Sequence, residues 1–308
     1  MPKDLIHIGY HKSATTWFQK VYYPGVRNAR YIDRNLVKRA FLEPSALHWR
    51  PDDARDLLNL DPDNPVILCE EELSGYLHNG GLFGCLSKDM AYRLRAVFPE
   101  ANIVAFIRRQ PDMLAACYAQ YIRGGGTFSV RRYLWPQRYL VGAESRYYKI
   151  PRFSFDHFEY LPLMRHYVEL FGRERVHVFP YEALAHGPEV FLQEFSQRLG
   201  LERAVDGPGS RRRNVSYQPW LIPVARLLNL MTRRTVQDKH YLVHIPYWYS
   251  ARRWFLEMVN RLPLSASSSP AGLLGAGTVA RINDRYRETN CQLAREFDMP
   301  LESYGYPL

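Results

Sequence analysis

A strand-like run, Leu5–Gly9, leads directly into a segment rich in groups that bind anions. Lys12 supplies a cation on a flexible stem, and Ser13, Thr15 and Thr16 supply hydroxyl donors. The helical pattern that follows would point its free first-turn N–H groups and the positive end of its dipole at the same place. Such a loop can bind a phosphate or sulfate group without a metal ion. A simpler interpretation stays open, in which the hydroxyls only cap the helix and Lys12 is a surface charge.

The phosphate-binding loop of nucleotide kinases is the competing interpretation of this segment. That loop needs Gly-x4-Gly-Lys followed by a Ser or Thr whose hydroxyl holds Mg²⁺. Here two residues separate Gly9 from Lys12, and no second glycine precedes the lysine. The spacing therefore disfavours a kinase.

The segment Tyr10–Trp17, which reads Tyr-His-Lys-Ser-Ala-Thr-Thr-Trp, resembles a loop of sulfotransferases that use 3′-phosphoadenosine-5′-phosphosulfate (PAPS). Their 5′-phosphosulfate loop typically reads Tyr-Pro-Lys-Ser-Gly-Thr-Thr-Trp, so His11 and Ala14 are the two departures. The resemblance implies that Lys12 bridges the 5′-phosphate and the sulfate, and that Trp17 packs on the adenine. It also implies that the 5′-phosphate is held by Ser13, Thr15 and Thr16, with Ala14 between them in the cofactor loop. Ala14 is strained there if the loop needs a positive φ.

The same resemblance implies a second phosphate site at the end of the strand-like run Asn102–Ile107. The family places an Arg there and a Ser on the following helix, both binding the 3′-phosphate. Arg108 fits in one register, with Ala116 at the serine position, and the nearby run Tyr-Ala-Gln-Tyr favours it. In the other register Arg109 is the ligand and Cys117 takes the serine position. Ligands bind at this edge of open α/β sheets, which supports a phosphate site. The alternative interpretation is that the two arginines are a solvated pair on the surface.

A third element is the basic run Arg211-Arg212-Arg213-Asn214-Val215-Ser216, which resembles the Arg/Lys-x-Asn-Val-Ser form of bacterial members. The resemblance implies that Arg212, Arg213 and Asn214 close over the 3′-phosphate. Arginine suits this task because its planar fork binds phosphate oxygens bidentately. A polybasic patch that contacts lipid or RNA is the alternative interpretation.

Three successive carboxylates, Glu70-Glu71-Glu72, follow the strand-like run Val66–Cys69. Glycan-modifying relatives often read Ser-Ser-Glu-x-Leu here, which implies that Glu71 removes the proton of the acceptor while Lys12 stabilises the leaving group. Alternation along a strand predicts that Glu71 points opposite to Glu70 and Glu72. His11 and His78 are the alternative general bases, and an acid-rich helix start is the structural alternative.

Strand patterns alternate with helical patterns over the first two thirds of the chain. Strands are expected at Leu5–Gly9, Val66–Cys69, Asn102–Ile107 and Arg175–Phe179. Helices are expected at Thr15–Tyr22, Ser87–Val97, Pro111–Arg123, Phe158–Phe171 and Pro188–Leu199. This order predicts an α/β fold with a central, mostly parallel sheet flanked by helices. The resemblance identifies it with the P-loop-like sulfotransferase fold and covers about residues 4–217, the expected PAPS-binding core.

Residues 218–308 are predicted to form a helical region that packs on this core within a single domain and contributes to the acceptor site. Helical patterns cover Pro219–Thr232, Tyr249–Arg261 and Thr278–Phe297, with an irregular surface loop expected over Ser265–Gly277. The many Tyr, Trp and Arg residues suit sugar rings and acidic groups, so a glycan, glycolipid or polysaccharide precursor is the expected acceptor. Amphipathic helices in this region also allow peripheral membrane contact.

The composition is that of a globular protein: 308 residues, 46% hydrophobic and 23% charged, with a net charge of +10. The basic surplus indicates an anionic partner, for which a phosphorylated cofactor suffices without nucleic acid. Apolar runs are shorter than the roughly 18 residues of a membrane span, and signal-peptide features are missing. A cytoplasmic protein is therefore expected. The four cysteines have neither zinc-site nor disulfide-framework spacing, so no metal is predicted.

Overall fold

The computed structural model describes the chain apart from residues 1–2, 140–151, 204–216, 233–239 and 262–268. The chain divides into two compact units. The first consists of Met1–Arg109, Asp156–Arg211 and Tyr286–Leu308, and the second of Gln110–Phe155 and Arg212–Arg285. The boundary predicted near residue 217 adjoins a range outside the described residues and stays a prediction.

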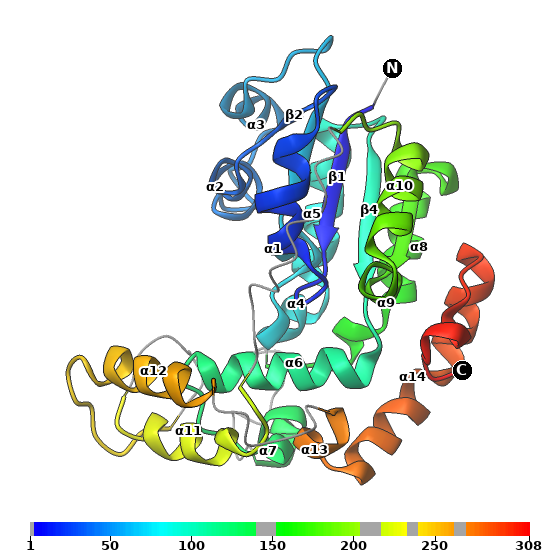
Figure 1. Ribbon diagram of the computed structural model, residues 1–308. Helices are drawn as coiled ribbons and strands as arrows, with labels where there is room; N and C mark the ends of the chain where they lie inside the picture. Colours follow the sequence, from blue (N-terminus) through cyan, green and yellow to red (C-terminus); the bar gives the residue numbers. More distant parts are fainter. Residues whose placement is uncertain (1–2, 140–151, 204–216, 233–239, 262–268) are drawn as a thin grey trace. The chain divides into compact units, whose positions relative to one another are not determined.

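A five-stranded sheet forms the centre of the first unit (Figure 1). Its strands are β1 (Leu5–Gly9), β2 (Arg30–Tyr31), β3 (Val66–Cys69), β4 (Asn102–Ile107) and β5 (Val176–Pro180). All neighbours pair in parallel, in the order β2-β3-β1-β4-β5. The predicted α/β fold with a central parallel sheet is therefore confirmed. The two-residue strand β2 is too short to leave a pattern in the sequence.

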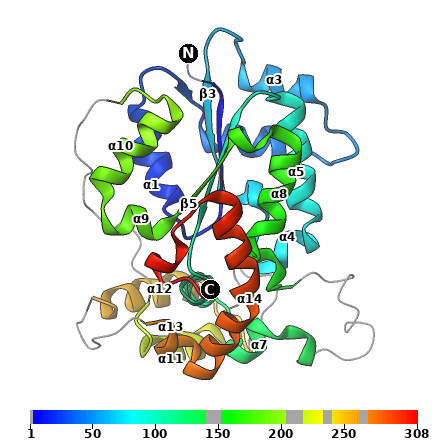
Figure 2. The same ribbon diagram turned by 90° about the vertical axis from the view of Figure 1, so that its right-hand side faces the viewer.

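Helices cover both faces of this sheet, as its almost fully buried strands require. Figure 2 shows α1 (Thr15–Trp17), α9 (Tyr181–His186) and α10 (Pro188–Leu199) on one face. The other face carries α5 (Cys85–Val97) and α8 (Tyr160–Phe171). The helix predicted at Thr15–Tyr22 is present, but after Trp17 it continues as a π-helix, Phe18–Tyr22.

An aromatic cluster fixes α1 and α10 against the sheet. The ring centroid of Phe106 on β4 lies 4.9 Å from that of Phe18 and 5.9 Å from that of Phe195. Phe18 and Phe195 are completely buried. Buried aromatic contacts of this kind contribute both area and specific geometry. They therefore hold the start of the first helix, and the loop before it, at a defined place on the sheet.

The end of the chain is tied to the carboxyl ends of β4 and β5. The hydroxyl of Tyr306 donates to Glu182 Oε2 at 2.9 Å, and the backbone N–H of Arg109 donates to Oε1 of the same carboxylate at 3.0 Å.

The other helical elements of the first unit are α2 (Arg34–Val37), the π-helix Lys38–Leu42, α3 (Pro51–Leu58), α4 (Gly80–Phe83), the C-terminal half of α14 (Ala276–Phe297), and short 3₁₀ turns, among them Glu71–Ser74, Leu77–Asn79, Asp156–Phe158 and Leu301–Tyr304.

The second unit is helical, and its centre is α6 (Gln110–Arg123), on which α11 (Leu221–Asn229) and α13 (Pro270–Leu274) pack. It also contains α7 (Val130–Leu134), the 3₁₀ turn Pro136–Tyr139, α12 (Trp248–Val259) and the N-terminal half of α14. The amide of Asn229, buried in α11, donates to the carbonyls of Ile122 at 2.9 Å and Gly126 at 2.6 Å, which anchors α11 to the end of α6. No described helix combines the length and apolar composition needed to span a membrane.

The irregular loop expected over Ser265–Gly277 is wrong for Pro270–Leu274, which form α13. Ser269 caps this helix by accepting a hydrogen bond from the Gly272 N–H at 3.2 Å. Proline at the first helical position adds a φ already suited to a helix. These two local signals outweigh the Ser/Gly/Ala composition that predicts a loop.

Candidate functional site

The predicted residues Lys12, Glu71 and Arg108, together with Tyr181, follow the carboxyl ends of neighbouring strands. In the spatial order of the strands, Glu71 follows β3, the Lys12 loop follows β1, Arg108 follows β4 and Tyr181 follows β5. Parallel strands end at the same edge of a sheet, which is the usual ligand-binding edge of open α/β folds. The sheet therefore brings residues as far apart in the sequence as Lys12 and Tyr181 to one edge.

Gly9, the last residue of β1, controls how closely the Lys12 loop and the carboxylate segment approach. Its φ of +86° favours glycine, and a Cβ atom at this position would lie 2.6 Å from the Cα of Glu71. The N–H of Glu70 donates to the carbonyl of His7 at 3.1 Å, which continues the pairing of β3 with β1. Only a residue without a side chain fits here, so Glu71 lies directly beside the start of the loop.

The loop turns back on itself through two left-handed residues, Lys12 (φ 64°) and Ala14 (φ 68°). The hydroxyl of Ser13 donates to the carbonyl of Tyr10, as does that of Thr15 at 3.3 Å. Ser13 and Thr15 are buried. The two hydroxyls therefore stabilise the turn in this state, and their predicted contacts with the 5′-phosphate stay predictions.

Four backbone N–H groups of this turn have no protein acceptor among the described residues, those of Ser13, Ala14, Thr15 and Thr16. Successive N–H groups in alternating right- and left-handed conformations form a concave site for anions. The first turn of the helix adds the positive end of its dipole. The loop can therefore hold an anionic oxygen cluster with backbone donors alone, and Lys12 supplies the charge.

Arg108 reaches this loop from β4. Its Nη1 donates to the carbonyl of Lys12 at 3.1 Å, and its guanidinium lies 5.0 Å from the centre of the Tyr181 ring. Tyr160 fixes the backbone by donating to the Arg108 carbonyl at 2.7 Å. The tyrosine contacts were not visible in the sequence, because α8 and α9 lie 50 or more residues further along the chain.

Arg109 lies differently, although it is the next residue. A Cβ atom on Gly305 would lie 3.1 Å from its Nη1, so its guanidinium lies at the C-terminal turn Leu301–Tyr304. This geometry agrees with the favoured register, in which Arg108 is the phosphate ligand. Cys117 is completely buried in α6 of the second unit, and Ala116 is half-buried. Arg212, Arg213 and Asn214 lie outside the described residues.

Trp17, predicted to pack on the adenine, is half-buried beside the aromatic cluster. Its ring centroid lies 5.2 Å from that of Phe18 and 5.9 Å from that of Tyr22. Thr16 is also half-buried. One part of the indole thus anchors the helix while another part stays accessible, and its contact with a base stays a prediction.

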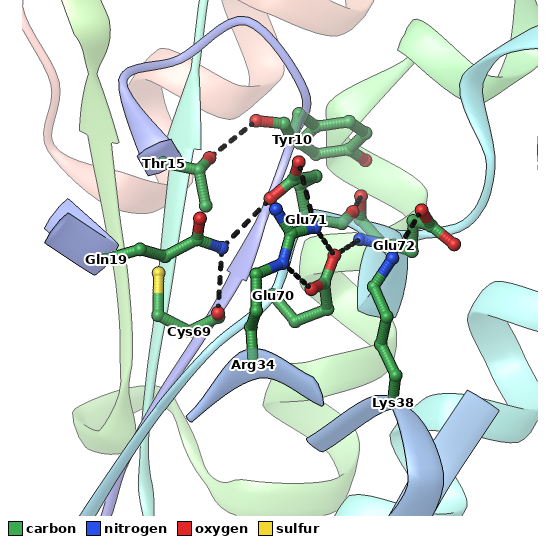
Figure 3. A network of polar contacts seen from close by, with 10 residues as sticks. Tyr10, Thr15, Gln19, Arg34, Lys38, Cys69, Glu70, Glu71 and Glu72 are labelled. Atoms are coloured by element: carbon green, nitrogen blue, oxygen red, sulfur yellow. Dashed lines mark hydrogen bonds and ion pairs between the residues drawn. The ribbon is translucent and has the colours of Figure 1, made fainter. Parts of the chain in front are cut away.

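The three carboxylates after β3 are held by cations from α2 and the π-helix that continues it (Figure 3). Arg34 binds Glu70 through two hydrogen bonds, Nε to Oε2 at 2.9 Å and Nη2 to Oε1 at 3.1 Å. Lys38 binds Glu72 at 3.0 Å. The side chain of Glu70 is fully buried, and this burial raises its pKa, with a smaller contribution from Glu71 and an opposing one from Arg34. Glu70 is therefore part of the support of the site.

Glu71 lies between α2 and the helix that follows the Lys12 loop. Its Oε2 accepts a hydrogen bond from Gln19 at 3.1 Å, and its Oε1 lies 3.5 Å from Arg34 (Figure 3). The predicted alternation of Glu71 with its neighbours is wrong, because Arg34 reaches both Glu70 and Glu71. The strand ends at Cys69, and Glu70 caps the 3₁₀ turn Glu71–Ser74.

Three histidines lie near the loop, of which His11 and His157 are buried and His78 is half-buried. Burial, followed by the charges of His157, His78 and Lys12, holds the pKa of His11 well below 6.5. Burial also lowers the pKa of His78 to about 3 and that of His157 to about 4. All three imidazoles are therefore neutral at pH 7. The Nδ1 of His11 has no hydrogen-bond partner among the described residues, so it can accept a proton.

The second unit contains a cavity of about 400 Å³ that the sequence did not indicate. It is lined by Arg131, Trp135, Arg138, Gly275, Gly277, Thr278 and Arg281. The guanidinium groups of Arg138 and Arg281 lie 5.9 and 6.0 Å from the centre of the Trp135 ring. Among the described residues, these two arginines and Arg131 form no ion pair with a carboxylate. The cavity therefore combines three arginines, which have no carboxylate partner among the described residues, with an aromatic surface. In the part of the chain that the structure describes, no group of three or more His, Cys, Asp or Glu could hold a metal ion.

Because Ala14 adopts φ 68°, replacing it with glycine is expected to stabilise the protein. Ala14→Gly should raise the free energy of unfolding by about 1 kcal/mol, since a left-handed backbone costs a residue with a Cβ atom about this much. Ala96→Gly in the exposed face of α5 is the control and should lower it by about 1 kcal/mol. Urea denaturation measures both. If Ala14→Gly lowered the free energy of unfolding as much as the control does, the conclusion that the loop is strained at Ala14 would be contradicted.

Neither a family model nor a curated protein matches the chain. Among solved structures, the chain is similar to a sulfotransferase from Alicyclobacillus acidocaldarius, with 17% identity and a TM-score of 0.48 over 70% of this chain and 87% of that one. It is also similar to the mouse sulfotransferase SULT7A1 complexed with PAP, with 12% identity and a TM-score of 0.38 over 96% of this chain and 85% of that one. The similarity is too remote to assign an activity.

Proposed function

We propose that the protein is a PAPS-dependent sulfotransferase that transfers a sulfuryl group to a hydroxyl or amine of an acceptor. The observation that carries the proposal is the contact between Arg108 and the carbonyl of Lys12. It adds a second cation beside a loop whose N–H groups have no acceptor among the described residues. An ATP site needs one such cradle for a run of linked phosphates, whereas PAPS carries phosphates at two separate positions of the ribose. Two adjacent cationic sites therefore suit PAPS better.

The residues of the loop fit the two ends of such a donor. The N–H groups of Ser13–Thr16 and the ammonium of Lys12 would hold the 5′-phosphate, and Arg108 the 3′-phosphate. When bound, PAPS supplies the sulfuryl group that is transferred. Lys12 would stabilise the negative charge that develops on the leaving phosphate, and the rigid turn keeps its backbone donors preorganised.

Glu71 is the proposed general base. Gln19 and Arg34 fix its carboxylate, and Gly9 holds its backbone beside the loop. A carboxylate held at the edge where the acceptor meets the donor can take the proton of the attacking hydroxyl. His11 is the alternative base, because its neutral imidazole adjoins Lys12 in the sequence and its Nδ1 has no partner among the described residues.

The proposed acceptor is an acidic saccharide, free or part of a glycolipid or polysaccharide precursor. The cavity of the second unit supports this, because Trp135 offers a face for a sugar ring while Arg138 and Arg281 offer partners for a carboxylate or phosphate. A neutral oligosaccharide that is sulfated as efficiently as its uronic-acid counterpart would contradict this class of acceptor.

Binding of adenosine 3′,5′-bisphosphate (PAP), measured by calorimetry in EDTA, tests the proposed donor. PAP is expected to bind at least about ten-fold more tightly than ATP, and Lys12→Met and Arg108→Met should each weaken it by about 10- to 100-fold, the value of a charge-assisted hydrogen bond. Arg109→Met is the matched control and should change the affinity by less than about three-fold. ATP binding that equals PAP binding and needs Mg²⁺ would instead indicate a kinase. A larger loss for Arg109→Met would indicate the other register.

Turnover under saturating PAPS tests the base. Glu71→Gln should lower kcat by about 10² while PAP affinity is kept, because the amide cannot accept the proton. His11→Gln should lower kcat by less than Glu71→Gln does. If His11→Gln instead lowered kcat more, His11 rather than Glu71 would be the general base. In that case the acid limb of the pH–rate profile would lie well below pH 6.5, since burial lowers the pKa of His11 and only the neutral imidazole acts as a base.

A further inference from the structure

The second unit exposes an unusual concentration of bulky apolar side chains. Eleven of the eighteen exposed large apolar residues in the described part of the chain lie between Val224 and Met258. We call this the apolar surface; its most prominent members are Leu227, Leu242, Val243, Tyr247, Trp254 and Phe255. Monomeric soluble proteins rarely concentrate exposed apolar side chains in one region, and such regions often mark an interaction site.

Packing within the unit does not account for these residues. In α11 the buried positions Leu221, Ile222 and Ala225 form the face that packs on α6. Val224 and Leu227 lie on a different face of the same helix and are exposed. A helix that is apolar on two faces needs a second apolar environment.

The exposed apolar residues lie on three successive described elements, α11, residues 240–247 and α12. The N–H of Leu242 donates to the carbonyl of Leu230 at 2.8 Å, and that of Ile245 to the carbonyl of Met231 at 3.1 Å, which ties the segment to the end of α11. The indole N–H of Trp248 donates to the carbonyl of Leu228 at 2.8 Å, which ties α12 to the same helix. The exposed apolar side chains are therefore carried by elements that hydrogen bonds hold together.

The charge of this stretch is strongly positive. Residues 217–261 contain seven Lys or Arg against two Asp or Glu, a net charge of +5 out of the +10 of the whole chain. One of the two acids, Glu257, is paired with both Arg123 at 2.9 Å and Arg253 at 3.0 Å. Arg252 is buried and Arg233, Arg234 and Lys239 lie outside the described residues, so the accessible described cations of this stretch are Arg226, Arg253 and Arg261. A positively charged stretch with exposed apolar side chains complements a surface that is apolar inside and anionic at its boundary.

We propose that α11, α12 and residues 240–247 bind the surface of an anionic lipid bilayer. Exposed Leu and Phe side chains would enter the acyl boundary, Trp and Tyr would lie at the headgroups, and arginines would pair with lipid phosphates. Protein interfaces, by contrast, are depleted of charge at their centre. The binding is interfacial, because no described helix can span a membrane. It does not depend on the sulfotransferase assignment, since it concerns binding alone.

Sedimentation of the full chain with lipid vesicles tests this proposal. The variant pair Leu242→Ser with Trp254→Ser removes side chains that are 83% and 67% exposed, so the fold should be kept. Leu47→Ser with Val190→Ser is the matched control, because these residues of the first unit are 92% and 65% exposed. The vesicles are phosphatidylcholine alone, or phosphatidylcholine with about 30% phosphatidylglycerol.

The wild type and the control pair should bind the anionic vesicles at least about ten-fold more tightly than the neutral ones, and less tightly in high salt. The Leu242/Trp254 pair should lose at least about ten-fold of this affinity. Brominated lipids should quench the tryptophan fluorescence of the wild type more than that of Trp254→Phe. Equal binding by both variant pairs, or no binding by the wild type, would overturn the proposal. So would self-association without vesicles that the Leu242/Trp254 pair abolishes, because the surface would then be an interface between copies of the chain.

Discussion

The close approach of Gly9 to Glu71 is the constraint on which the site depends. Because a Cβ atom on Gly9 would lie 2.6 Å from the Cα of Glu71, the end of β1 and the exit of β3 are in direct backbone contact. The anion loop and the carboxylate therefore start from one point of the sheet. The aromatic cluster around Phe18 and Phe106 holds the helix that follows, so the loop between them has little freedom.

That rigidity has a cost and a chemical use. Lys12 and Ala14 are held at positive φ, and the N–H groups that follow them are left with no acceptor among the described residues. Strained backbone and unsatisfied donors persist only where the surroundings over-determine them, and they gather at functional sites. The arrangement supports a site that is preorganised for anionic oxygens before any ligand arrives. The neutral histidines nearby add no competing positive charge at pH 7.

The sequence was most informative where the signal is local. The bounds of β1, β3 and β4 follow from short buried β-branched runs, and Arg108 and the Lys12 loop follow directly on such strands. The sequence could not predict contacts that only the fold brings together. Glu71 contacts Arg34 and Gln19, and Arg108 contacts Tyr181. These partners are single residues, and nothing in their spacing along the chain marks them. The orientation of Glu71 was wrong because alternation holds only while the strand continues, and here it ends at Cys69. The Arg–Trp cavity joins residues 131–138 with 275–281, which no local pattern could connect.

The central claim is that two separate cations, Lys12 and Arg108, serve two separate phosphates at this edge of the sheet. Phosphorus NMR of bound PAP tests it most directly, because the 3′- and 5′-phosphates give distinct resonances. The Lys12→Met variant is expected to shift mainly the 5′ resonance relative to wild type, and Arg108→Met mainly the 3′ resonance. If both variants moved the same resonance, or neither PAP resonance shifted when the wild-type protein was added, the assignment of two phosphate sites would be contradicted.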